Sequence, residues 1–224
     1  MAKPAVILVG ADKGGVGKTT VSRALLDYLI AHNIPTRAFD TEFPKGTLRR
    51  FHPDITEVVD LTSTADQMKV FDSVSTASAQ ITVIDVRAGL LSTTLKALRD
   101  IGFLDAAKKS QLTFGVFHIL GPSVASLDEI AETSGYMGEL SYFLVKNFIN
   151  NTTFFEWDPA TYNGLFQEDQ RRPGDHRSET QRDGLRTGRA CVGAVRVVRG
   201  EQGNRHAVRQ LFFRAARLCP ALAR

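Results

Sequence analysis

Short apolar runs alternate with longer amphipathic stretches from residue 5 to about residue 150. A short run rich in β-branched residues predicts a buried strand, and apolar residues three or four apart predict a helix. The alternation predicts βαβ units, and hence a doubly wound, mostly parallel α/β domain. The predicted strands are 5–10, 36–40, 58–61, 81–85, 112–120 and 142–147, and the predicted helices are 18–31, 65–77, 92–99 and 126–137.

The pattern stops after about residue 158. Between residues 167 and 206 the chain is rich in Arg, Gly and Gln, and only the patch 191–198 resembles a strand. Such a composition gives no periodic apolar face from which to build a core. We therefore expect an α/β domain at residues 1–166 and an irregular, Arg-rich tail at residues 167–224.

Charge divides the chain at the same place. The net charge is +4, but residues 1–170 hold 15 Lys and Arg against 20 Asp and Glu, whereas residues 171–224 hold 13 Arg, no Lys and four acidic residues. The basic character belongs to the tail alone.

Several classes of protein are excluded by what the sequence lacks. The apolar run that follows Pro4 is too short for a signal peptide or a membrane span, so we expect a cytoplasmic protein. Cys191 and Cys219 lie too far apart for a CxxC metal site or a disulfide framework. The five histidines show no metal-ligand spacing.

A glycine-rich segment follows the first predicted strand and leads into the first predicted helix. It reads Lys13-Gly14-Gly15-Val16-Gly17-Lys18-Thr19. Backbone N–H groups in such a loop converge on phosphate oxygens at the positive end of the helix dipole. We expect Lys18 to reach the β- and γ-phosphates, Thr19 to ligate Mg²⁺, and Thr20 to contact the α-phosphate. The segment predicts a nucleoside triphosphate site with magnesium.

Carboxylates follow two of the predicted strands. Asp40 and Glu42 come at the end of strand 36–40, and Asp85 ends the apolar strand 81–85. Ligands of α/β sheets bind at the carboxyl ends of the strands. Asp85 therefore has the form of a residue that holds Mg²⁺ directly or through a water.

The loop departs from the pattern G-x-x-x-x-G-K-[ST], because Asp12 stands in place of the first Gly and Lys13 follows it. It resembles the K-G-G-x-G-K-[ST] loop of the ParA/MinD superfamily of partitioning and positioning ATPases. In that family the first lysine, here Lys13, reaches the nucleotide of a second subunit. The resemblance therefore implies an ATP-dependent homodimer.

Three further segments resemble the same superfamily. Asp40-Thr41-Glu42 resembles its D-x-D segment, with Glu42 for the second Asp, and Asp40 is carried over as the residue that positions the attacking water or the metal. Asp85-Val86-Arg87-Ala88-Gly89 resembles its D-x-P-A-G switch, with Arg87 for Pro. Asn147, at the end of a predicted strand, is similar to its base-contacting Asn.

The resemblance implies slow ATP hydrolysis that serves the partitioning or positioning of plasmids, chromosomes or protein complexes. The implied partners are nonspecific DNA or a membrane surface and an adaptor or activator protein, so the protein would associate with the nucleoid or the inner membrane. Nitrogenase iron proteins, cluster carriers and arsenite-pump ATPases need cysteines, which residues 1–190 lack, and no tyrosine cluster follows Tyr162 as in the tyrosine kinases of this fold. Two alternatives stay open, a small-molecule ligase or kinase similar to dethiobiotin synthetase and a nucleotide-gated conjugation or plasmid-stability module.

The tail has three interpretations. The switch to Arg without Lys and the loss of periodicity suggest an out-of-frame reading of the gene's 3′ end, which is the interpretation we favour. Arg side chains could instead bind DNA phosphates. Alternatively, residues 205–218 place apolar side chains at helical spacing among arginines, as in an interfacial membrane helix.

Overall fold

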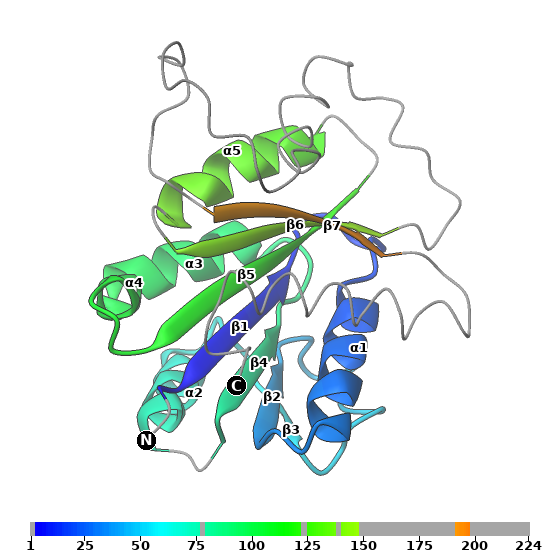
Figure 1. The fold of residues 1–224 in the computed structure, drawn as a ribbon, viewed down its shortest axis with the longest axis vertical. Coiled ribbons are helices and arrows are strands. Elements are labelled where there is room, and N and C mark those ends of the chain that lie inside the picture. The colour runs from blue at the N-terminus through cyan, green and yellow to red at the C-terminus, as the bar shows by residue number, and fades with distance from the viewer. Residues whose placement is uncertain (1–2, 77–78, 122–124, 138–139, 148–190, 198–224) are drawn as a thin grey trace, which may run out of the picture.

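The computed structural model describes residues 3–76, 79–121, 125–137, 140–147 and 191–197 (Figure 1). These residues form a sheet of seven strands in the order β3-β2-β4-β1-β5-β6-β7, and every neighbouring pair is parallel. The strands are β1 (Ala5–Gly10), β2 (Thr36–Asp40), β3 (Thr56–Val58), β4 (Ile81–Asp85), β5 (Thr113–Leu120), β6 (Ser141–Asn147) and β7 (Cys191–Val197).

Helices cover both faces of this sheet (Figure 1). One core packs α1 against one face, through residues such as Leu25, Leu29 and Ile7. The other packs the remaining helices against the opposite face, through residues such as Leu95 and Leu8. Successive β1 side chains enter different cores, because neighbouring residues of a strand point to opposite faces. The helices are α1 (Lys18–Ala31), α2 (Thr64–Thr76), α3 (Leu91–Asp100), α4 (Phe103–Lys108) and α5 (Ala125–Met137).

The predicted doubly wound α/β fold is confirmed, with two differences in its elements. β3 ends at Val58, where the predicted strand begins, because the chain leaves the sheet in a turn in which the Asp60 carboxylate accepts the Thr62 N–H at 2.9 Å. The short helix α4 was not predicted. It has only six residues, which is too few to show a period, and it is placed by the burial of Phe103 and Leu104.

β7 coincides with the strand-like patch of the tail. It pairs with β6 from Ser141↔Cys191 to Asn147↔Val197. These seven residues are therefore not irregular, and their pairing satisfies backbone groups along an edge of β6 that would otherwise be open. The predicted helix at 205–218 lies outside the described residues, and the boundary at residue 166 stays a prediction.

None of the helices in the described part of the chain has the length and apolarity that crossing a membrane requires.

Candidate phosphate-binding site

The glycine-rich loop connects the carboxyl end of β1 to the start of α1. Gly15 has φ 73° and Gly17 has φ 91°, backbone conformations that favour glycine. Gly17 is the N-cap of α1, no side chain caps this end, and no acidic residue lies in its first turn. The amides at this end are thus not used by a side-chain cap, which is the arrangement of an anion site.

Lys18 bends back over this loop. Its Nζ donates to the carbonyl oxygen of Lys13 at 3.1 Å. Burial lowers the pKa of Lys18, and nearby carboxylates oppose that shift, those of Asp85, Glu42, Glu129 and Asp12. A half-buried cation surrounded by carboxylates, beside a loop of glycines, is placed to bind phosphate.

Asp85 ends β4 below the loop and receives two hydroxyl hydrogen bonds. Thr19 Oγ1 donates to Asp85 Oδ2 at 2.8 Å, and Ser22 Oγ donates to Oδ1 at 2.9 Å. Burial raises the pKa of Asp85 to about 7; the two hydroxyl donors and Lys18 oppose this rise, and the charge of Asp40 adds to it. The site therefore joins the loop hydroxyl to a buried carboxyl group, as the sequence predicts.

These oxygens fit magnesium in one specific way. Mg²⁺ retains several waters and binds through one or two carboxylates together with substrate phosphates. Thr19 Oγ1 and Asp85 Oδ2 are hard oxygens beside the phosphate loop. Among the described residues, no group of three or more His, Cys, Asp or Glu side chains could hold a metal by itself. The residues therefore fit Mg²⁺ as the companion of a bound phosphate.

Asp40 lies beside Asp85 in the strand register, but its oxygens are engaged elsewhere. The side chain is fully buried. Its Oδ1 accepts the Glu42 N–H at 2.9 Å, and its Oδ2 accepts the N–H groups of Leu48 at 2.6 Å and Arg49 at 3.2 Å. Asp40 thus holds the loop 42–49 in place, a structural use of both oxygens that sequence reasoning missed. A contact of Asp40 with water or metal stays a prediction.

Glu42 is the carboxylate of this segment that faces the phosphate loop. It is half-buried, and its charge opposes the shift of the Lys18 pKa. The Thr47 hydroxyl donates to Glu42 Oε2, which holds the side chain. In the sequence, Glu42 departs from the D-x-D segment that it otherwise resembles, because Glu stands in place of the second Asp.

Asn147 reaches the loop from the end of β6. Its Nδ2 donates to the carbonyl oxygen of Val16 at 2.9 Å, and the residue is buried. The amide thus holds the loop backbone in this structure, while contact with a base stays a prediction.

The exposed part of the loop consists of Lys13, Gly14, Gly15 and, at the start of α1, Thr20. All four can therefore meet a ligand from solvent. Their predicted contacts with phosphate or a second subunit stay predictions.

Sequence reasoning missed a group of residues behind the loop. The Asp12 carboxylate accepts the Leu91 N–H at 2.9 Å, and the Asp12 N–H donates to Glu129 Oε2 at 3.3 Å. His118 Nε2 lies 3.3 Å from the same Glu129 oxygen. In the sequence, Asp12 is only a departure from the usual loop pattern, and no spacing links it to Leu91 or Glu129.

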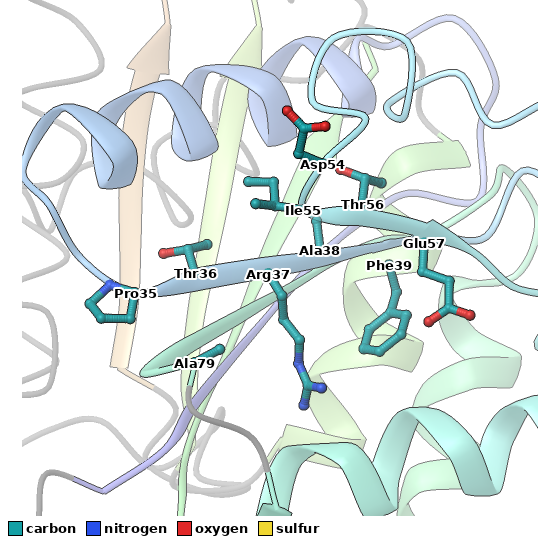
Figure 2. A pocket seen from close by; sticks show the side chains of 10 residues that line it. All are labelled: Pro35, Thr36, Arg37, Ala38, Phe39, Asp54, Ile55, Thr56, Glu57 and Ala79. Carbon is teal, nitrogen blue, oxygen red and sulfur yellow. The ribbon is translucent and has the colours of Figure 1, made fainter.

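A hollow of about 750 Å³ lies along β2 and β3, lined by residues 35–39 and 54–57 and by Ala79 (Figure 2). Arg37 and Phe39 project to one side of the β2–β3 pair, and Thr56 projects to the other. Arg37 Nε donates to Thr82 at 3.2 Å, and the guanidinium carbon lies 5.3 Å from the centre of the Phe39 ring. This hollow shares no lining residue with the phosphate loop.

No protein-family profile matches the sequence, and no curated protein matches it. Two crystal structures of a plasmid partition protein from Borrelia burgdorferi, one bound to AMPPNP, match over 95% of this chain and 99% of theirs, with a TM-score of 0.57 and 13% identity. Chloroplast FtsY from Physcomitrella patens matches with a TM-score of 0.46 and 15% identity, over 65% of this chain and 51% of that one. The chain thus spans about half the length of that FtsY structure. The similarity to the partition protein is one of fold, and that fold is the fold of the P-loop nucleoside triphosphatases.

Proposed function

The chain has the fold of a P-loop nucleoside triphosphatase, and we propose that it is an ATPase of the ParA/MinD kind, which hydrolyses ATP slowly and dimerises when ATP is bound. The observation that carries the proposal is the contact between Thr19 and Asp85 at 2.8 Å, directly beside Lys18 and the uncapped start of α1. The backbone amides at the start of α1, the Lys18 ammonium and two side-chain oxygens therefore lie together, which supports a site for phosphate and Mg²⁺.

Each part of this site has its own role in the proposal. The backbone amides of residues 14–19 and the Lys18 ammonium bind the phosphates. Thr19 and Asp85 hold the Mg²⁺ that would accompany them, and the bound ion would offset charge on the phosphate oxygens. Glu42, held by Thr47, accepts a hydrogen bond from the attacking water and orients it toward the phosphate.

Binding is tested first with Lys18→Ala. Removing the ammonium should abolish ATP binding, measured by titration calorimetry with Mg²⁺. Lys96→Ala removes an exposed lysine from α3 and is the matched control. Unchanged affinity in Lys18→Ala would reject the proposed site.

Dimerisation is tested with Lys13→Ala. Lys13 is exposed at the mouth of the loop, where a second subunit could be reached. The variant should bind ATP as a monomer but should not form the dimer seen by size-exclusion chromatography with a nonhydrolysable analogue. Lys45→Ala, at another exposed lysine, is the control. Unchanged dimerisation would remove Lys13 from the proposal.

Partitioning or positioning requires a surface on which the protein is placed. We propose that nonspecific DNA or an anionic membrane serves, together with an activating protein, and that the protein is nucleoid- or membrane-associated in the cytoplasm. ATP turnover measured with and without duplex DNA or anionic vesicles tests this. Turnover that depends instead on a small acid or amine would favour the ligase alternative.

A further inference from the structure

The start of α3 packs against the end of β1 and is hydrogen-bonded to the loop that follows β1. A Cβ on Gly10 would lie 2.7 Å from Leu91 Cδ1, so the two residues pack as closely as only glycine permits. Asp12 Oδ1 accepts the Leu91 N–H at 2.9 Å, and Asp12 Oδ2 accepts the Ser92 hydroxyl at 2.7 Å. Leu90, at the N-cap position, makes no side-chain cap. The cap of α3 therefore comes from the loop, about 80 residues earlier in the chain.

The other side of Asp12 is attached to α5. Its N–H donates to Glu129 Oε2 at 3.3 Å, and His118 Nε2 lies 3.3 Å from the same oxygen. His118 is fully buried, and its Nδ1 lies 2.5 Å from the hydroxyl of Tyr142, which itself lies 2.6 Å from Thr133 Oγ1. A buried network of this kind holds the Glu129 side chain in one position. If Glu129 moved, His118 and the Asp12 N–H would each lose a hydrogen-bond partner in the interior.

The negative charge of Asp12 favours the protonated form of Lys18, but it does not favour an anion bound beside it. The Asp12 carboxylate lies near Lys18, as does that of Glu129. Negative charge beside an anion site weakens phosphate binding. If Asp12 were only a loop residue, its removal should therefore strengthen ATP binding.

We propose that Asp12 is a positioning residue that couples the phosphate loop to α3 and, through Glu129, to α5, so that nucleotide binding and the conformation of the α3 start depend on each other. α3 directly follows the segment 86–90 after Asp85, so the coupled helix begins at the end of the switch-like segment. This inference rests on the proposed function for its link to ATP, whereas the contact itself can be tested without nucleotide.

The first test measures ATP affinity in the full chain carrying Asp12→Ala, Ser92→Ala or both. Ser92 lies on α3 and its hydroxyl contacts Asp12. We expect each single change to weaken binding by about fivefold or more, and the double change to be no weaker than the stronger single change. Thr93→Ala, which removes an exposed hydroxyl from the same helix, should leave affinity unchanged.

Two results would overturn the coupling. One is unchanged or tighter ATP binding in Asp12→Ala, which is the result expected from charge alone. The other is an equal effect of Ser92→Ala and Thr93→Ala, which would mean that any loss of hydroxyl on α3 acts alike.

The second test uses hydrogen exchange in nucleotide-free protein. Ser92→Ala should speed the exchange of the loop amides at residues 13–17, far from it in sequence, and Thr93→Ala should not. If the wild-type chain bound no ATP, the proposed function would fail, yet this measurement would still decide the coupling. Unchanged exchange in the loop of Ser92→Ala would reject it.

Discussion

Two neighbouring carboxyl groups, Asp40 and Asp85, are paired in the strand register and are both buried, yet their surroundings differ. Asp40 accepts three backbone N–H groups, which use both of its oxygens. Asp85 accepts two hydroxyl groups, and burial raises its pKa to about 7. Asp40 therefore stabilises the fold, whereas Asp85 can change its hydrogen bonds when a ligand binds.

The raised pKa of Asp85 predicts a pH dependence of stability in the absence of metal and nucleotide. Its folded pKa of about 7 lies above the ordinary value of 3.8, so the unfolded chain releases this proton first. The contribution of Asp85 to stability is complete below pH 4, falls between about pH 4 and 7, and is lost above that. Three pKa units correspond to about 4 kcal/mol.

Asp85→Asn should remove this dependence. Denaturant unfolding with EDTA at pH 5 and pH 8 should show a larger loss of stability in the wild type than in the variant. If the free energy of unfolding fell equally between pH 5 and pH 8 in the two proteins, the raised pKa of Asp85 would be contradicted.

Substitution of Asp40 should lower stability, whereas substitution of Glu42 should slow ATP hydrolysis. Asp40→Ala leaves the buried Leu48 N–H and two partly buried N–H groups without their acceptor. A buried unsatisfied group costs about 1–3 kcal/mol and a partly buried one costs less, so the free energy of unfolding should fall by roughly 2 kcal/mol or more. A variant as stable as the wild type would show that the loop 42–49 does not depend on this carboxylate.

Glu42→Gln should leave stability nearly unchanged and should not weaken ATP binding, because it removes a negative charge near Lys18. It should slow hydrolysis by about 100-fold, since it removes the base that orients water. Single-turnover hydrolysis separates this from binding. Glu57→Gln, on β3, is the matched control. Normal turnover in Glu42→Gln would return the water-positioning role to another group.

At the scale of elements, Gly46 shows how tightly the loop 42–49 is fitted to β3. It has φ 63°, and a Cβ there would lie 2.5 Å from Val58 Cγ2. Gly102 has φ 76° but no atom within 4 Å of such a Cβ. Comparing substitutions of Gly46 and Gly102 therefore distinguishes the cost of backbone strain from the cost of steric overlap.

Gly102→Ala should cost about 1–2 kcal/mol for its left-handed backbone alone. Gly46→Ala should cost more, by about 1–3 kcal/mol of overlap. Adding Val58→Ala to Gly46→Ala should relieve the overlap and leave the backbone cost. Thermal unfolding measures all of these, and equal costs for the two glycines would show that the loop yields to the added methyl.

The sequence predicts elements that have periodic apolar residues or a local motif. It does not predict contacts between segments that are distant along the chain. The strands ending at Asp40 and Asp85 follow from apolar runs, and the phosphate loop follows from its glycines and Lys18. The amides that surround Asp40 come from residues that carry no side-chain signal. The capping of α3 by Asp12 joins distant segments, so no local pattern could indicate it.

For the whole molecule, the phosphate loop depends on the first 147 residues. Each hydrogen bond described above between the loop and other elements reaches α3, β4, α5 or β6. A chain ending at Asp169 should therefore bind ATP with the affinity of the full chain. The shortened chain should have a lower unfolding temperature than the full chain, because it lacks β7 and leaves the edge of β6 unpaired.

Calorimetry and thermal unfolding of the two chains test this, and resequencing the gene's 3′ end tests the reading frame. Equal stability would support an out-of-frame tail. Loss of the folded core would show that the tail belongs to the domain and that the boundary at residue 166 is wrong.

The strand order has a consequence for synthesis on the ribosome. β1 is made first, but its partners are β4 and β5, whose residues 81–85 and 113–120 emerge much later. Until then this wholly apolar strand has no neighbour, and such an exposed segment invites association with other chains. β5 must therefore be synthesised before β1 is paired on both sides. A pause in translation before residue 113 leaves the nascent protein with one edge of its central strand unpaired.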